Sequence, residues 1–195
     1  MRPRLRCAVV LGAAALLTAL SLDFVGAETR NRGLQRLLER NFTAEQSLQI
    51  ERGYRAAQQA GLQERRILDL VETCVDADFE APAIARMLSL AAQLNLERLP
   101  VESFVAKIEE GIAKRVPPER VLQAAERRAL MLNRARTIVN GAVLEGFDLR
   151  DRDEILPDVA AALEAGVSAE AIRRILVDSL EAGDGVGDIR RKLFP

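Results

Sequence analysis

The sequence predicts an all-α fold in which short antiparallel helices stack, either as an irregular helical bundle or as a short α-solenoid-like array of hairpins. Apolar residues recur three and four positions apart through most of the chain, as they do on one face of a helix. The sustained alternation of apolar and polar residues that marks strands is missing. Prolines, glycines and capping residues also fall where such helices would begin and end.

Capping residues define the first helices. A leucine-rich stretch predicts a short helix that ends near Asn41. Thr43 then fits a helix N-cap, because Gln46 completes a capping box three residues later, and Gly61 fits the end of that helix. A further helix is expected over residues 64–75.

Prolines mark the beginnings of the next three helices. Proline in a first helical turn loses no hydrogen bond, so Pro82, Pro100 and Pro118 each predict a helix start. The pair Pro117-Pro118 also ends the preceding helix. The helix that follows this pair is expected to be the longest, with inward-facing apolar residues as far as Val139.

The last third of the chain is less regular. Residues 148–154 predict a charged connector, and Pro157 predicts the start of a helix that Gly166 ends. Ser168 fits the N-cap of another helix, which reaches about residue 182. Glycines at alternate positions then predict a hinge, and we expect the C-terminal helix over 184–195 to be loosely held.

One helix-start unit recurs along the chain. An apolar residue is followed by a helix-initiating pair, usually by a glutamate, and by a second apolar residue five positions after the first. The unit begins at residues 62, 99, 116 and 167, so that its starts lie 37, 17 and 51 residues apart, close to multiples of 17. Such a period fits one short helix with its loop, and two would form a hairpin of the size found in solenoids. Unrelated short helices would show caps at comparable spacing, so true repetition and a simple bundle both stay open.

The start of the chain predicts export. Three arginines lie within the first six residues, an apolar run covers 7–22, and small residues precede Glu28. This is the order of a secretory signal peptide, here over 1–27 with cleavage after Ala27, which predicts a periplasmic protein. Retention of the segment as a membrane anchor is the alternative. The apolar run is shorter than the roughly 20 residues that a spanning helix needs and is followed by Asp23. We therefore expect one helical domain over 28–195 and no stable membrane span after cleavage.

Composition disfavours several classes of function. Histidine and tryptophan are absent, which removes histidine-based relays, the commonest transition-metal ligand and the largest aromatic platform. The net charge of −1 lacks the basic excess of nucleic-acid-binding proteins. Cys74 is the one cysteine after the signal and lies among apolar residues, so we interpret it as a small buried hydrophobe. We expect no enzyme, no cofactor, no metal and no nucleic-acid partner.

The densest charged stretch runs from Lys107 to Arg120 and contains the pattern Glu-Gly-x-Ala-Lys-x-Val-Pro-Pro-x-Arg. This segment resembles one found in uncharacterised exported all-helical proteins of proteobacteria, a resemblance that implies no known activity. Arg115 stands where the resemblance would have glycine. We regard the turn as a candidate interaction site formed by Lys107, Glu110, Lys114, Arg115, Pro117, Pro118 and Arg120.

Other patterns have simpler interpretations. Glu102-Ser103 matches the catalytic dipeptide of lytic transglycosylases, but their Gly-Leu-Met-Gln and Ala-Tyr-Asn-x-Gly stretches are absent, and Glu102 fits a first-turn helix residue. The acidic cluster at 76–80 has the alternation of a calcium loop but lacks its glycine and its length, and arginines interrupt the cluster at 148–154. Both clusters fit solvated connectors.

Three classes of function follow from these patterns. The first is a helical interaction or scaffolding protein with an envelope protein partner. The second is a periplasmic carrier or chaperone for an apolar ligand or an unfolded segment, with Met87 and Met131 as candidate lining residues. The third is an enzyme that uses carboxylates, lysine or arginine alone. The sequence leaves the partner and the oligomeric state open.

Overall fold

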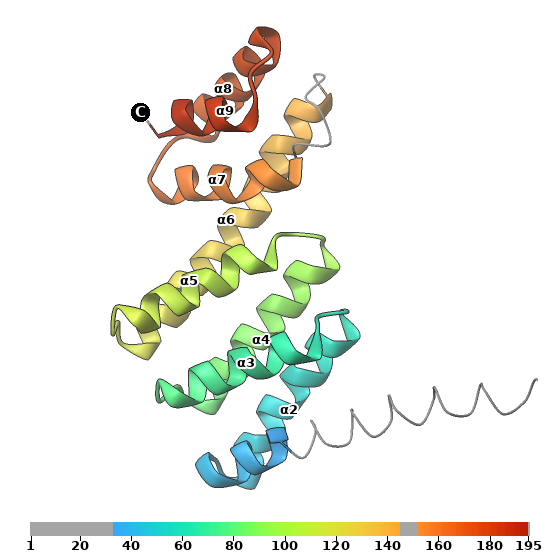
Figure 1. Cartoon of the computed structure of the whole chain (residues 1–195), viewed down its shortest axis with the longest axis vertical. Coiled ribbons are helices and arrows are strands. Elements are labelled where there is room, and N and C mark those ends of the chain that lie inside the picture. Colours follow the sequence, from blue (N-terminus) through green and yellow to red (C-terminus); the bar gives the residue numbers. More distant parts are fainter. Residues whose placement is uncertain (1–32, 145–151, 195) are drawn as a thin grey trace, which may run out of the picture. The chain divides into compact units, whose positions relative to one another are not determined.

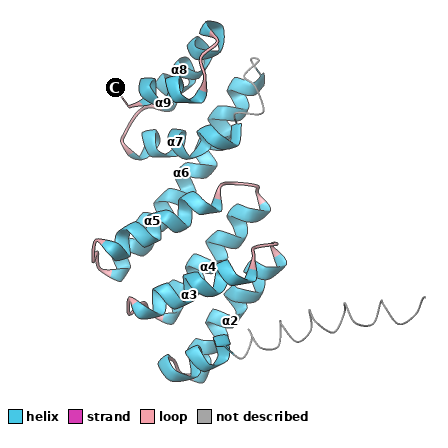
Figure 2. Cartoon of the chain, viewed as in Figure 1, coloured by secondary structure: helices cyan, strands magenta, loops and turns pink. Residues whose placement is uncertain are grey.

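The computed structural model describes residues 33–144 and 152–194, and all regular structure within these ranges is helical (Figure 2). The all-α fold is therefore confirmed. The chain divides into two compact units, Met1–Thr43 and Ala44–Pro195. The signal-peptide prediction falls on residues outside the described ranges.

In the first unit, residues 33–41 are helical. The Asn41 side-chain amide donates a hydrogen bond of 2.8 Å to the carbonyl of Leu37. The Asn41 side chain thus bonds back onto the last turn of this helix. The predicted helix end near Asn41 is confirmed.

The second unit contains the labelled helices of Figure 1. They are α2 (Ala44–Gln59), α3 (Glu64–Asp76), α4 (Ala81–Leu96), α5 (Val101–Ala113), α6 (Pro118–Leu144), α7 (Arg152–Glu164), α8 (Ala169–Ala182) and α9 (Val186–Leu193). The predicted starts near Pro82, Pro100 and Pro118 and the Ser168 cap are confirmed.

The helices of the second unit pack in two layers. In one layer α2 lies against α4, α4 against α6, and α6 against α8. The other layer contains α5, α7 and α9. Of these, α5 and α7 both pack on α6 of the first layer, and α9 packs on α7 and on α8 (Figure 1). The long helix α6 thus contacts α4, α5, α7 and α8, and its buried face carries Val121, Leu132 and Val139.

Most connections in this unit share one backbone turn. A residue in the left-handed region ends the helix, and the amide of the next residue bonds to the carbonyl five positions earlier, as Leu62 does to Ala57 at 3.1 Å. This is the Schellman arrangement of a helix C-terminus. The left-handed residues are Gly61, Asp78, Arg98, Arg115, Gly166 and Gly183.

This turn explains the recurring helix-start unit. The unit's first apolar residue is the residue after the left-handed one, and the next helix begins two positions later. A fifth copy begins at Phe79, where the glutamate, Glu80, directly follows the apolar residue and the turn is the same. Phe79 and Leu99 are buried and close the core beneath their turns, whereas Leu62, Val116 and Val167 are half-buried.

The contact between α2 and α4 depends on a glycine. A Cβ added to Gly53 would lie 3.1 Å from the Ala85 carbonyl oxygen and 3.1 Å from the Leu88 Cβ. Both distances are shorter than ordinary van der Waals contact. The two backbones therefore approach more closely than a larger residue at position 53 would allow.

The structure differs from two expectations for the last third of the chain. The prediction that Pro157 opens a helix is wrong, because α7 begins at Arg152 and holds Pro157 in its interior. The helix extends upstream because Ile155 and Leu156 are fully buried, and this burial outweighs the one backbone hydrogen bond that proline cannot donate. In the predicted glycine hinge, Gly187 lies inside α9, whose Ile189 is buried.

Candidate functional site

The structure gathers the candidate interaction turn at the connection between α5 and α6. Lys107 and Glu110 lie on α5, Lys114 is its C-cap, and Pro118 is the first residue of α6. Arg115 has a φ of 54°, the left-handed conformation that glycine adopts without strain. Pro117 and Arg120 complete the turn, and the Arg120 amide bonds to the Pro117 carbonyl at 2.9 Å.

The charges of this turn are paired within it. Glu110 lies between two lysines, with Lys107 Nζ 3.0 Å from its Oε2 and Lys114 bonded to its Oε1. The Lys114 hydrogen bond, followed by that of Lys107, lowers the Glu110 pKa from 4.5 to about 2. The resulting stabilisation is present above pH 4.5 and is lost as the pH falls through 2. Because the three side chains are well exposed, it amounts to less than about 1 kcal/mol.

Val116 and Gly111 hold the connection between α5 and α6 together. The Val116 amide closes the Schellman turn on the Gly111 carbonyl at 3.0 Å. A Cβ on Gly111 would lie 2.8 Å from Val121 Cγ2, so glycine is needed for α5 to approach α6. Each of these features serves the helix connection itself, and the interaction role of the turn stays a prediction.

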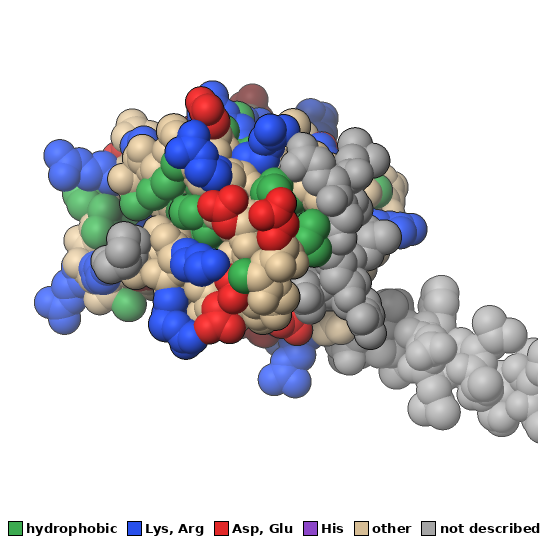
Figure 3. All heavy atoms as spheres, turned by 90° about the horizontal axis from the view of Figure 1, so that it is seen from above, with side chains coloured by type: hydrophobic (Ala, Val, Ile, Leu, Met, Phe, Trp, Pro, Cys, Tyr) green, Lys and Arg blue, Asp and Glu red, His purple; other side chains and the backbone are tan. Residues whose placement is uncertain are grey.

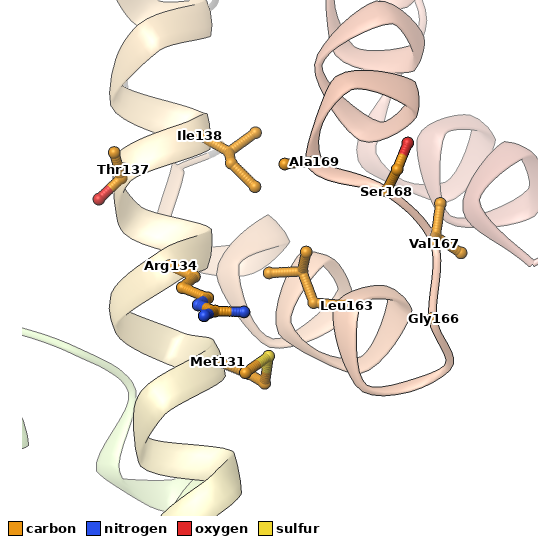
Figure 4. Close-up of a pocket in the computed structure, with 9 residues that line it drawn as sticks. All are labelled: Met131, Arg134, Thr137, Ile138, Leu163, Gly166, Val167, Ser168 and Ala169. Atoms are coloured by element: carbon orange, nitrogen blue, oxygen red, sulfur yellow. The ribbon is translucent and has the colours of Figure 1, made fainter.

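A hollow that the sequence did not reveal lies between α6 and the turn that joins α7 to α8 (Figure 4). Its volume is about 470 Å³. We call it the α6–α8 groove; its lining residues are Met131, Arg134, Thr137, Ile138, Leu163, Gly166, Val167, Ser168 and Ala169.

The wall that α6 contributes is apolar with one charge. Met131 and Ile138 point into the groove, and Arg134 extends its guanidinium group into it between them (Figure 4). Thr137 turns away, and its hydroxyl donates a hydrogen bond of 3.3 Å to the Asn133 carbonyl (Figure 4). This side of the groove therefore suits a ligand that is apolar and carries a negative charge.

The opposite wall comes from the end of α7 and the start of α8. Leu163 faces the α6 residues, and Gly166, with a φ of 93°, turns the chain toward α8. Ser168 caps α8 by accepting a hydrogen bond of 3.1 Å from the Ala171 amide. Because the Ser168 hydroxyl is used by the helix, apolar contact dominates this wall.

A buried arginine fixes the position of that wall. Arg128 is 9% exposed and donates from Nε to the Ser103 hydroxyl of α5 at 3.0 Å and from Nη2 to the Pro157 carbonyl of α7 at 3.2 Å. Its Nη1 lies 3.4 Å from Glu164 Oε2 at the end of α7. Since Leu163 precedes Glu164, this network ties the groove wall to α5 and α6.

A second, smaller hollow of about 200 Å³ lies between α4 and α6. Its walls include Leu90 and the exposed Leu130. An ion pair of 2.8 Å between Arg86 and Glu126, one from each helix, is part of its lining. Because its charges are already paired, this hollow is a weaker candidate for ligand binding than the α6–α8 groove.

The other residues considered for catalysis or metal binding are Glu102, Ser103 and the acidic clusters. Glu102 pairs with Arg66 at the surface, while the Ser103 hydroxyl is held by Arg128, so each has its own structural partner. Within the described residues there is no cluster of three or more carboxylates and cysteine that could hold a metal ion. Asp148 and Asp151 of the second acidic cluster lie outside the described ranges.

Cys74 is a core residue, as the sequence suggested. It is fully buried, and its thiol donates to the Met87 sulfur at 3.8 Å. Burial raises the thiol pKa from 9.0 to about 12. Met87 is likewise fully buried, whereas Met131 lines the α6–α8 groove. Of these two candidate lining residues, only Met131 therefore lies at the α6–α8 groove.

Comparison with protein-family models, with curated proteins and with solved structures gives no match to this chain. The resemblance to exported proteobacterial proteins therefore stays a prediction. In the part of the chain that the structure describes, no helix has both the length and the apolar character needed to cross a bilayer.

Proposed function

We propose that this chain is an exported helical interaction protein that holds a partner of the cell envelope in the α6–α8 groove. The groove carries the proposal, because it is an open apolar hollow on a helical array with one charged side chain, Arg134, pointing into it (Figure 4). Arrays of helical hairpins commonly present such surfaces to other proteins.

The charges of the described residues give little support to an enzyme. The carboxyl groups with clearly shifted pKa values in these ranges are Glu110 and Asp184, and both pKa values are lowered, chiefly by a hydrogen bond from a lysine at the surface. A general acid or base near neutral pH would instead need a raised carboxyl pKa in a cleft. The face in Figure 3 carries basic and acidic side chains close together, as an ordinary solvated surface does.

Site-specific photocrosslinking in cells tests the proposal. A photoreactive amino acid at Ala169, an exposed residue of the groove, should capture one envelope protein in stoichiometric amount. The same amino acid at Glu109, exposed on α5, is the matched control and should not. Placed at Arg115, it asks whether the α5–α6 turn is a contact site as well. Capture at Glu109 equal to that at Ala169 would contradict the proposal.

Export is part of this proposal and has its own test. The arginines and the apolar run within 1–27 are the supporting observations. Cell fractionation should place the protein in the periplasm, and amino-terminal sequencing should begin at Glu28. A chain that keeps residue 1 and sediments with membranes would support the anchor alternative.

A carrier or chaperone of apolar ligands is the second candidate, which the volume and apolar walls of the same groove favour. Its test is extraction of the purified full-length protein followed by lipid mass spectrometry. A stoichiometric lipid that is lost in Ala169→Trp, which fills the groove, would support the carrier. A broad set of unrelated proteins captured at Ala169 would support the chaperone.

A further inference from the structure

Three arginines form a row along α6. Arg120, Arg127 and Arg134 are exposed and lie seven positions apart, which is close to two helical turns, so they share one side of the helix. Arg134 lines the α6–α8 groove, and the other two continue from it toward the start of α6. The row spans 14 residue steps, from Arg120 to Arg134, and is roughly 21 Å long.

The charge of this row is not neutralised within the described part of the chain. No ion pair joins Arg120, Arg127 or Arg134 to a described residue. Arg128 and Arg136 of the same helix do form such pairs, with Glu164 and Glu97. The structure thus pairs the arginines that face its interior and leaves a row of three positive charges beside an apolar groove.

From this juxtaposition we propose that the partner presents an acidic amphipathic helix. Its apolar side chains fill the groove against Met131, Ile138 and Leu163, and carboxylates seven residues apart lie along the arginine row. Helices that dock in grooves use this combination of an apolar stripe and a charged edge. This inference rests on the proposed function, since it names the partner of the same groove.

The geometry favours a helix over a lipid. A single-chain amphiphile has one anionic head, which would engage Arg134 and leave the other two arginines, up to roughly 21 Å away, unused. A bilayer presents a broad surface, whereas the apolar residues here line a hollow. Because the arginines are exposed, they should mainly speed association and select the partner, and their effect should weaken with salt.

The test uses two synthetic peptides of 18 residues and the full-length protein. Both peptides have leucines on one helical face; one has glutamate at every seventh position beside that face, and the other has lysine there. Fluorescence anisotropy should show binding of the glutamate peptide at least tenfold tighter than that of the lysine peptide. The double variant Arg127→Glu/Arg134→Glu should weaken the glutamate peptide at least tenfold and improve the lysine peptide.

Two control variants separate the effect of the arginine charges from that of the apolar groove. Arg52→Glu changes an exposed arginine on α2 and should leave binding within twofold. Ala169→Trp should weaken both peptides, because it fills the groove and leaves the arginine row intact. Circular dichroism at 222 nm checks that each variant keeps its helices.

Each contrary outcome overturns the inference. Equal affinity for the two peptides, no binding of either, or no effect of the double charge reversal would exclude an acidic helix. Tighter binding of vesicles containing phosphatidylglycerol, or of palmitate, than of the glutamate peptide would replace the helix by a lipid. In all of these cases a single protein crosslinked at Ala169 would leave the proposed function standing and remove only the acidic helix.

Discussion

Replacing Arg115 by glycine should stabilise the protein. Arg115 is exposed at the end of α5 with a φ of 54°, a conformation that costs an ordinary residue about 1–2 kcal/mol. Glycine removes this cost but gives the unfolded chain more freedom, which offsets about 0.5–1 kcal/mol. The net gain in the free energy of unfolding is therefore about 0.5–1 kcal/mol, or roughly 1–4 °C in the melting temperature of a chain of this size.

Urea unfolding followed by circular dichroism at 222 nm measures the effect. Arg115→Gly should raise the midpoint concentration of urea without changing the slope of the transition. Arg98→Gly has the same geometry, with a φ of 55°, and should give a similar increment. The two turns are separate, so the double variant should show the sum of the two effects.

The matched control is Arg127→Gly, which makes the same chemical change in the interior of α6. There the glycine should destabilise the protein by about 1 kcal/mol, because it lowers helix propensity without relieving strain. Opposite signs at positions 115 and 127 are thus the signature of the left-handed turn. A lower urea midpoint for Arg115→Gly would refute the reasoning.

Three further outcomes are expected. Cys74 should react with a thiol reagent only after unfolding. The free energy of unfolding should fall by up to about 1.4 kcal/mol per pH unit between pH 9 and 12, since the thiol ionises first in the unfolded chain. Cys74→Ala should remove this pH dependence of the urea midpoint. Gly53→Ala should cost about 1–3 kcal/mol by overpacking, whereas Gly141→Ala, which meets nothing within 4 Å, should add about 0.5–1 kcal/mol in the same assay. Arg128→Ala should cost about 3 kcal/mol because it leaves Glu164 unpaired, and a double-mutant cycle with Glu164→Gln should recover part of that loss.

The helix ends were predictable because their determinants are local. Proline at a first turn, serine at an N-cap and glycine at a C-terminus act through their own backbone, and α6 and α8 begin where Pro118 and Ser168 indicated. Arg98 and Asp78 were not recognised as left-handed residues, because neither is a glycine. The start of α7 was missed for a different reason: the burial of residues upstream of Pro157 is a tertiary effect, which no local rule contains.

The α6–α8 groove could not be predicted in the same way. Met131 and Leu163 lie 32 residues apart, and they face one another because Arg128 holds the end of α7 against α6. The sequence offered Met131 as a candidate lining residue, but nothing in it placed Leu163 opposite. The sequence analysis did not single out the arginine row, because a spacing of seven gains its meaning only beside a groove that the packed helices form.

The position of α6 also has a consequence for how the protein unfolds. This helix contacts α4 and α5 before it and α7 and α8 after it, whereas α9, the last described helix, packs mainly on α7 and α8. Opening of such an array proceeds from its least supported ends. We therefore expect amide hydrogens in the middle of α6 to exchange with solvent later than those of α9, so that the groove loses its α8 wall before its α6 wall.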